Sequence, residues 1–281
     1  MTQVTPALIK ELRDRTGVGM AKCKEALDEA KGDIDTAIEI LRKAGMASGV
    51  KKQGRETKEG AIVAKDTQSF VALVEINAET DFVAQNEKFK QFCIQVAEEV
   101  ASTHPASLEA FLHQPYSKDK SITIDQLRSL LIQTIGENIQ IRRIQLMKKE
   151  PGTSIGIYSH MGGKLLTAVQ LKGAGEEELA KAVAMHVAAA SPEFLSPEKI
   201  APEVITKERE IAREQVAGKP AHIMDKIIDG KINAFFDQAC LTRQKYIRDD
   251  SVSVGEFVKR EGKTRGKDVE VIGFVRWAVA Q

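Results

Sequence analysis

Apolar residues repeat at helical spacing in three runs over the first 45 residues. Thr5 followed by Pro6 predicts a helix start, since threonine caps helix N-termini and proline suits the first helical position. Glycines at the ends of the runs, among them Gly17 and Gly45, predict where helices stop. The pattern therefore predicts a three-helix module at residues 1–45, small enough to be a compact recognition module.

Residues 46–60 differ in composition, because lysine, arginine and glycine replace most apolar residues there. Such a composition predicts a flexible basic linker. A run of like charge is ordinarily a solvated surface, and contact with an acidic partner is the alternative.

Residues 61–150 show apolar runs in the order strand, strand, helix, helix, strand. The alternation of the third strand slips at Arg142–Arg143, as a β-bulge would produce. The predicted elements are strands at 61–65, 70–76 and 139–147, a helix ending near Ser102 and a helix at about 123–135.

The same order of elements begins again after Pro151–Gly152. The sequence Ser253-x-x-Glu256 is a capping box and predicts the start of a helix. The predicted elements are a strand containing Ile155 and Ile157, a strand at 165–171, a helix at 176–190 and a last strand at 269–279.

Residues 192–238 interrupt this second set with purely helical periodicity around the turn Gly218-Lys219-Pro220. Two helices joined by a tight turn form an antiparallel hairpin. Such a hairpin has little core of its own, so its apolar face calls for a partner, either a second copy of the chain or another protein.

The fold class expected from this order is α+β, with helices packed on two sheets. We expect a two-part core of β-β-α-α-β units with the hairpin inserted in the second. The expected divisions are the module at 1–45, the linker at 46–60, core subdomains at 61–150 and at 151–191 with 239–281, and the hairpin at 192–238.

Charge and cysteine content argue against several classes of protein. There are 41 basic and 40 acidic residues, for a net charge of +1, which argues against a protein devoted to holding nucleic acid. Three widely spaced cysteines form no disulfide framework and no zinc pattern. No apolar run approaches a membrane span, and the first residues resemble no targeting peptide, so we expect a soluble cytoplasmic protein.

No motif of an enzyme is present in the sequence. The five histidines show no metal-ligand spacing, and His186, on an apolar helix face, is expected to be a core imidazole. No nucleophile elbow, phosphate-binding loop or dinucleotide fingerprint occurs. We therefore predict no enzymatic activity, no cofactor and no metal.

The stretch Asn77–Val83 lies between an apolar strand and an amphipathic helix. Binding groups are common at such turns, where Asp81 and Phe82 would be presented together. The local pattern favours another interpretation, in which Asp81 caps the helix and Phe82 begins the helix core, since Phe82 and Phe89 lie two turns apart. The residues alone leave both interpretations open.

Four motifs together resemble the translation elongation factor Ts family. They occur in the family's order and span nearly the whole chain, with the helical hairpin before the last strand. The motifs are Arg13–Met20 with Cys23–Leu27, Thr80-Asp81-Phe82-Val83, Ile135-Gly136-Glu137-Asn138 with the strand that follows, and Met185–Ala189.

The resemblance implies a guanine-nucleotide exchange factor that binds the GTPase elongation factor Tu with GDP bound. It implies that Phe82, beside Asp81, wedges next to the GTPase's switch region, disturbs its magnesium and phosphate site and releases GDP. It also implies an N-terminal UBA-like module and a hairpin of the coiled-coil or dimerisation type. The GTPase-binding residues it implies are Thr80, Asp81, Phe82, Val83, Ile135, Gly136, Glu137, Asn138, His160, Arg13, Met20 and Lys24.

Two other functions remain open on the residues. The helix, Thr16–Gly19, helix arrangement also resembles a helix-hairpin-helix motif, whose glycine amides would meet nucleic-acid phosphates, although the near-neutral charge argues against it. The second alternative is a scaffold protein built around the helical hairpin, without exchange activity.

Overall fold

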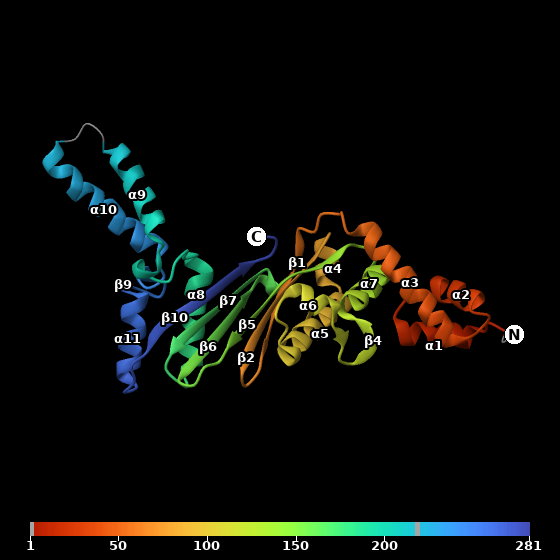
Figure 1. Cartoon of the computed structure of the whole chain (residues 1–281). Coiled ribbons are helices and arrows are strands. Elements are labelled where there is room, and N and C mark those ends of the chain that lie inside the picture. The colour runs from red at the N-terminus through yellow and green to blue at the C-terminus, as the bar shows by residue number, and fades with distance from the viewer. Residues whose placement is uncertain (1–2, 217–219) are drawn as a thin grey trace. The chain divides into compact units, whose positions relative to one another are not determined.

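The chain divides into two compact units in the computed structural model, which describes residues 3–216 and 220–281. The first unit comprises Met1–Lys148, Gly162–Lys164 and Ala278–Gln281, and the second Lys149–Met161 and Leu165–Trp277. Helices and strands are mixed in both (Figure 1), which places the fold in the α+β class. The UBA-like character of the first helices stays a prediction.

The first unit is built on an antiparallel sheet of order β1-β2-β5. The pairing of β2 with β5 shifts beside Glu75, where Arg142 is skipped, which confirms the bulge predicted there. The elements are α1 (Pro6–Thr16), α2 (Met20–Glu29), α3 (Ile34–Lys52), β1 (Glu59–Asp66), β2 (Phe70–Ala78), α4 (Asp81–Gln85), α5 (Glu87–Thr103), α6 (Leu108–His113), β3 (Pro115–Tyr116), β4 (Asp119–Thr123), α7 (Ile124–Ile135) and β5 (Ile139–Lys148).

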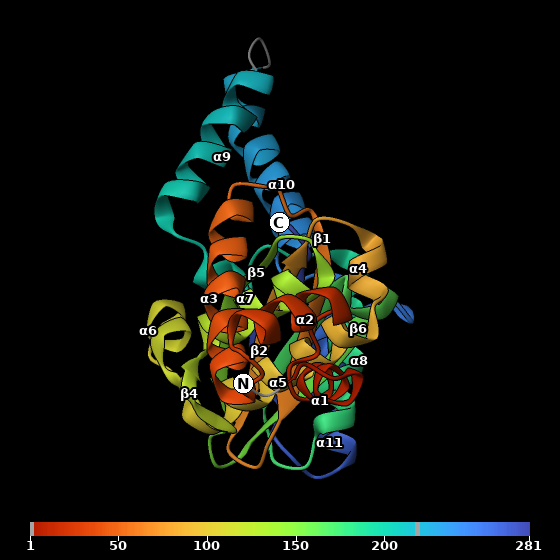
Figure 2. The same ribbon diagram turned by 90° about the vertical axis from the view of Figure 1, so that its right-hand side faces the viewer.

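The start of α1 is confirmed, because the Thr5 hydroxyl accepts a hydrogen bond from the Leu8 amide at 3.3 Å. The predicted end of the third helix is wrong, since α3 continues through Gly45 to Lys52. Gly45 and Gly49 face α7, and a Cβ on Gly49 would lie 2.9 Å from Ser129 Oγ. These glycines permit close helix packing, with α3 beside α7 in Figure 1 and Figure 2, and residues 46–52 are helix and not linker.

The second unit has a sheet of order β10-β7-β6, with α8 packed on β6 and β7. The Ser253 capping box at the start of α11 is confirmed, since the Glu256 carboxylate accepts a hydrogen bond from the Ser253 amide at 2.7 Å. The elements are β6 (Thr153–His160), β7 (Leu165–Lys172), α8 (Glu177–Ala190), α9 (Pro202–Gln215), α10 (Ala221–Ala239), β8 (Lys245–Tyr246), β9 (Asp249–Ser253), α11 (Val254–Thr264) and β10 (Glu270–Ala278).

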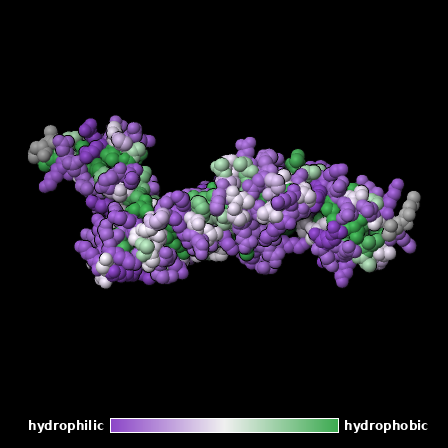
Figure 3. Space-filling view, turned by 60° about the horizontal axis from the view of Figure 1, so that its bottom comes forward, coloured by the Kyte–Doolittle hydropathy of each residue, from purple (hydrophilic) through white to green (hydrophobic). Residues whose placement is uncertain are grey.

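Helices α9 and α10 pack against each other and bury Ala212, Val216, Ile228 and Ile232 between them. This small cluster agrees with the expectation that the insert has little core of its own. Apolar patches are still visible over it in Figure 3, and Ile211 is 39% exposed. The predicted turn at residues 218–219 lies outside the described residues.

His186 is a buried and satisfied core residue of the second unit, as predicted. Its Nδ1 accepts from the Ile247 amide at 3.3 Å, so the proton is on Nε2, which donates to Gln244 Oε1 at 2.9 Å. The Gln244 amide then donates to the carbonyl of Gln238 in α10 at 2.7 Å. Burial lowers the pKa of His186, because the charged imidazolium would lose its hydration.

We expect the second unit to lose stability as the pH falls below about 6.5, the ordinary histidine pKa. The folded pKa lies below the unfolded one, so the stabilisation is complete above the unfolded value and is lost as protons bind preferentially to the unfolded chain. The contribution of His186 to the slope of the unfolding free energy against pH reaches up to about 1.4 kcal/mol per pH unit. Urea unfolding at pH 5.5 and 7.5 measures the change in the free energy of unfolding, and His186→Gln should flatten its dependence on pH.

All three cysteines are free and buried. Among residues 3–216 and 220–281, no helix is both long and apolar enough to cross a membrane.

Candidate functional site

Phe82 lies on α4, a helix of five residues that follows the end of β2. The cap of α4 is Thr80, whose hydroxyl accepts from the Val83 amide at 3.4 Å, so the expectation of an Asp81 cap is wrong. Val83 is buried, whereas Phe82 is 84% exposed and belongs to no core. The local interpretation of Phe82 as a core residue is therefore wrong as well.

The helical conformation is interrupted at Asn86, between α4 and α5. The extended backbone of Asn86 ends α4, and its side chain caps α5. The sequence predicted one continuous helix here. Because α4 is separate from α5, Phe82 and Phe89 do not share a helix face: Phe89 is fully buried, and Phe82 points to solvent.

Two loops meet beside α4, because the last residue of β2, Ala78, pairs with the first of β5, Ile139. Glu137 accepts from the Thr80 amide at 3.0 Å and from the Thr80 hydroxyl at 2.7 Å. Glu79 accepts from the Asn138 amide at 2.6 Å. We call these hydrogen bonds the loop contacts; they bring together two motifs that lie 57 residues apart.

Ile135 and Gly136 end α7 next to the loop contacts. Gly136 is the C-cap, with a φ of 96° that favours glycine, and it is exposed while Ile135 is half-buried. The structure thus places Ile135, Gly136, Glu137 and Thr80 at one corner of the first unit.

Arg13, Met20 and Lys24 are exposed on α1 and α2 of the same unit. Lys88 of α5 donates to the carbonyl of Gly17 at 2.9 Å, and Lys22 donates to that of Gln133 at 3.2 Å.

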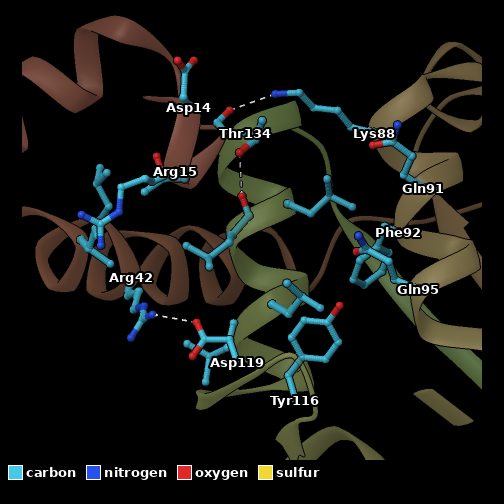
Figure 4. Close-up of a pocket in the computed structure, with 18 residues that line it drawn as sticks. Asp14, Arg15, Arg42, Lys88, Gln91, Phe92, Gln95, Tyr116, Asp119 and Thr134 are labelled. Carbon is cyan, nitrogen blue, oxygen red and sulfur yellow. Dashed lines mark hydrogen bonds and ion pairs between the residues drawn. The ribbon is translucent and has the colours of Figure 1, made fainter. Parts of the chain in front are cut away.

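A groove of about 650 Å³ is lined by α1 and α3 on one side and by α5 and α7 on the other (Figure 4). The Lys88 bond crosses one end of it, and Arg42 pairs with Asp119 at 3.0 Å across the other. The three-helix module is therefore attached to the core by contacts between specific residues.

His160 ends β6 in the second unit, so the structure does not bring it together with Phe82 within one unit. Its ring stacks on Tyr158, with Nδ1 3.0 Å from the Tyr158 hydroxyl. The neighbouring Met161 is 72% exposed. An exposed imidazole and an exposed thioether at a strand end suit contact with another protein surface.

Within the described residues, no group of three or more His, Cys, Asp or Glu side chains could hold a metal ion. The first unit presents a short capped helix that carries an exposed aromatic ring next to an exposed carboxylate, which is suited to binding a partner protein.

Comparison with known proteins identifies the family. The family model described as Elongation factor TS matches residues 79–281. Elongation factor Ts of Protochlamydia amoebophila is 60% identical over 282 residues, covering 100% of both chains. Those of Chlamydia felis and Chlamydia trachomatis are 43% and 42% identical, and each alignment covers 99% of both chains.

The chain belongs to the elongation factor Ts family.

Membership of the elongation factor Ts family places the chain in translation elongation, and the helix-hairpin-helix alternative finds no support at residues 16–19. The Gly17 amide donates to the Arg13 carbonyl at 2.7 Å, and the Val18 amide to the Thr16 hydroxyl at 3.4 Å. Both amides are used inside the module and are not free to bind a phosphate.

No role was predicted from the sequence for Glu79 of the first unit or for Met161 of the second unit. Glu79 follows β2 immediately, and an acidic residue at a strand end was the available signal. Met161 gives no comparable signal, since only its exposure and its positive φ of 50° distinguish it.

Proposed function

We propose that the chain is a guanine-nucleotide exchange factor that binds elongation factor Tu carrying GDP and promotes GDP release in the cytoplasm. Membership of the elongation factor Ts family supports the exchange activity and the partner. In the proposed mechanism, Phe82 enters the GTPase beside its switch region and disturbs the magnesium and phosphate site. Asp81, on the same turn, contacts the surface next to it.

Phe82 is the residue that carries this proposal, because a phenylalanine 84% exposed has no role in the fold. Its short helix is held by the Thr80 cap and by buried Val83 and Ala84. Because the backbone that presents the ring is already fixed, little backbone entropy is lost on binding, which favours the use of Phe82 as an anchor.

Such a factor makes and breaks no covalent bond. It acts by binding the nucleotide-free GTPase more tightly than the GDP-bound one, and by linkage it then weakens GDP binding by the same factor. Burying one phenylalanine contributes about 1.5 to 3 kcal/mol, which corresponds to about one or two powers of ten in rate. Any larger acceleration requires the rest of the surface.

We propose that the rest of this surface has three parts. Arg13, Met20 and Lys24 on the first two helices hold a second point of the GTPase. Ile135, Gly136 and Glu137 flank the Phe82 helix, with the fully buried Asn138 supporting them from inside the fold. His160 contributes from the second unit.

The affinity for the two states of elongation factor Tu tests this proposal. Isothermal titration should give a dissociation constant at least about tenfold lower for the nucleotide-free GTPase than for the GDP-bound GTPase, since tenfold corresponds to 1.4 kcal/mol of coupling. Equal affinities for the two states would contradict the proposal, because a ligand without preference shifts no equilibrium.

We further propose that a second copy of the chain packs against the α9–α10 hairpin. The partly exposed Ile211 and the apolar patches over these helices support it. Sedimentation velocity should detect a dimer that Ile211→Glu weakens; a monomer at all micromolar concentrations would rule the contact out.

A further inference from the structure

We infer that Glu79 and Glu137 are positioning residues, which orient Phe82 through the loop contacts rather than by touching the GTPase. The inference rests on the proposed function, because it concerns how the exchange surface is kept in shape. It changes the role expected for Glu137, and it adds Glu79, which no resemblance had indicated.

Both oxygens of Glu137 are occupied by Thr80. Oε1 accepts from the Thr80 hydroxyl at 2.7 Å and Oε2 from the Thr80 amide at 3.0 Å. With its proton directed to Glu137, the hydroxyl keeps lone pairs for the Val83 amide, which it caps at 3.4 Å. Hydrogen bonds to an ionised carboxylate are roughly twice as strong as neutral ones. Glu137 thereby fixes the cap residue of the helix that carries Phe82.

Glu79 makes the reciprocal contact. Its Oε1 accepts from the Asn138 amide at 2.6 Å and lies 3.4 Å from the Arg55 guanidinium. Each loop therefore supplies a glutamate to a backbone amide of the other loop, directly beyond the Ala78–Ile139 pair of the sheet. Two such contacts restrict rotation of the turn more than either alone, because they act at adjacent residues.

The same corner also holds the segment that follows α3. The Asn138 side-chain amide donates to the Arg55 carbonyl at 2.8 Å and to the Gln53 carbonyl at 3.4 Å. Thr57 is buried, with its hydroxyl 3.4 Å from Gln140 Oε1. These bonds contradict the expectation of a flexible linker at residues 53–57. They join the end of the N-terminal helices to the base of the Phe82 helix, and a fixed spacing between two binding points reduces the entropy lost on binding.

A double-mutant cycle on the full-length protein tests the inference. The variants are Glu137→Gln, Thr80→Val and the double variant, with Thr80→Ser as the conservative rescue and exposed Glu109→Gln on α6 as the matched control. Glu137→Gln replaces one of the two accepting carboxylate oxygens with an NH2 group. Thr80→Val removes the threonine hydroxyl and leaves the backbone amide. The two readouts are the maximal rate of GDP release from elongation factor Tu and hydrogen exchange of the Val83 and Ala84 amides in the free protein.

We expect each single variant to lower the maximal release rate about tenfold, as for the loss of one hydrogen bond to a charged group. The double variant should lose clearly less than the product of the two single losses, because both variants disturb the same contact between the Thr80 hydroxyl and Glu137. Thr80→Ser should recover most of the rate lost in Thr80→Val, and Glu109→Gln should retain the full rate. Losses that multiply in the double variant would overturn the inference, since Glu137 would then act independently of the Thr80 hydroxyl.

Hydrogen exchange separates this inference from the proposed function. The Val83 and Ala84 amides should exchange about tenfold faster in Glu137→Gln than in Glu109→Gln, because their helix loses an anchor. Unchanged exchange there would overturn the positioning role even if GDP release responds. Failure of the unaltered protein to release GDP would refute the proposed function, while the amide comparison would still decide whether Glu137 positions the helix.

Discussion

Replacing Phe82 with alanine is expected to slow GDP release from elongation factor Tu by about ten- to hundredfold, with thermal stability unchanged. The ring is 84% exposed in the free protein, so its removal costs the fold little. Its burial against the GTPase would supply the 1.5 to 3 kcal/mol that this loss in rate corresponds to. Stopped-flow release of a fluorescent GDP and a thermal melt measure the two effects separately.

Ile94→Ala is the matched control for Phe82→Ala. Ile94 is an apolar side chain on α5 of the same unit and is 54% exposed, so its removal tests whether any exposed apolar group contributes. We expect the rate to stay within about twofold. If Phe82→Ala retained the full rate, or if it lowered stability by several kcal/mol as a core residue would, Phe82 would not be the wedge.

Replacing Gly156 with alanine is expected to destabilise the second unit by at least about 3 kcal/mol. Gly156 is buried in β6 where α8 crosses the strand, and an added Cβ would overlap the backbone nitrogen of Lys181 and lie 2.7 Å from Ala180 Cβ. Backbone atoms of a packed helix cannot move aside as a flexible side chain can, so the helix would have to leave the sheet.

Gly273→Ala in β10 of the same sheet is the control for Gly156→Ala, because no atom lies within 4 Å of the Cβ it would add. Urea unfolding should show a change within about 0.5 kcal/mol for Gly273→Ala. Equal effects of the two substitutions would show that the close approach of α8 to β6 does not limit stability.

Helix starts and apolar strands were predictable because their signals are local. Thr5, Thr123 and Ser253 cap helices as their sequence neighbours indicate, and the slip in alternation located the bulge beside Arg142. The errors have a different origin. Gly45 and Gly49 are typical helix ends by sequence, yet they lie inside α3 because Ser129 of α7 packs against them.

In the candidate site, too, features with a local sequence signal were predictable and features set by tertiary packing were not. The resemblance drew attention to Asp81 and Phe82, whereas the local pattern favoured a core phenylalanine because it did not detect the helix break at Asn86. The loop contacts of Glu79 and Glu137 depend on the pairing of β2 with β5, and a contact between residues 57 apart has no signal in periodicity. Exposure of Phe82 is likewise a property of the folded unit.

The rate of GDP release tests the central claim most directly. Elongation factor Tu is preloaded with fluorescent GDP and mixed in a stopped-flow instrument with excess unlabelled GDP and increasing concentrations of the full-length protein. We expect release to accelerate with concentration to a plateau at least about tenfold above the spontaneous rate, and we expect Phe82→Ala to lower this plateau. A release rate that stays at the spontaneous value, with the protein folded and bound to the GTPase, would contradict the claim.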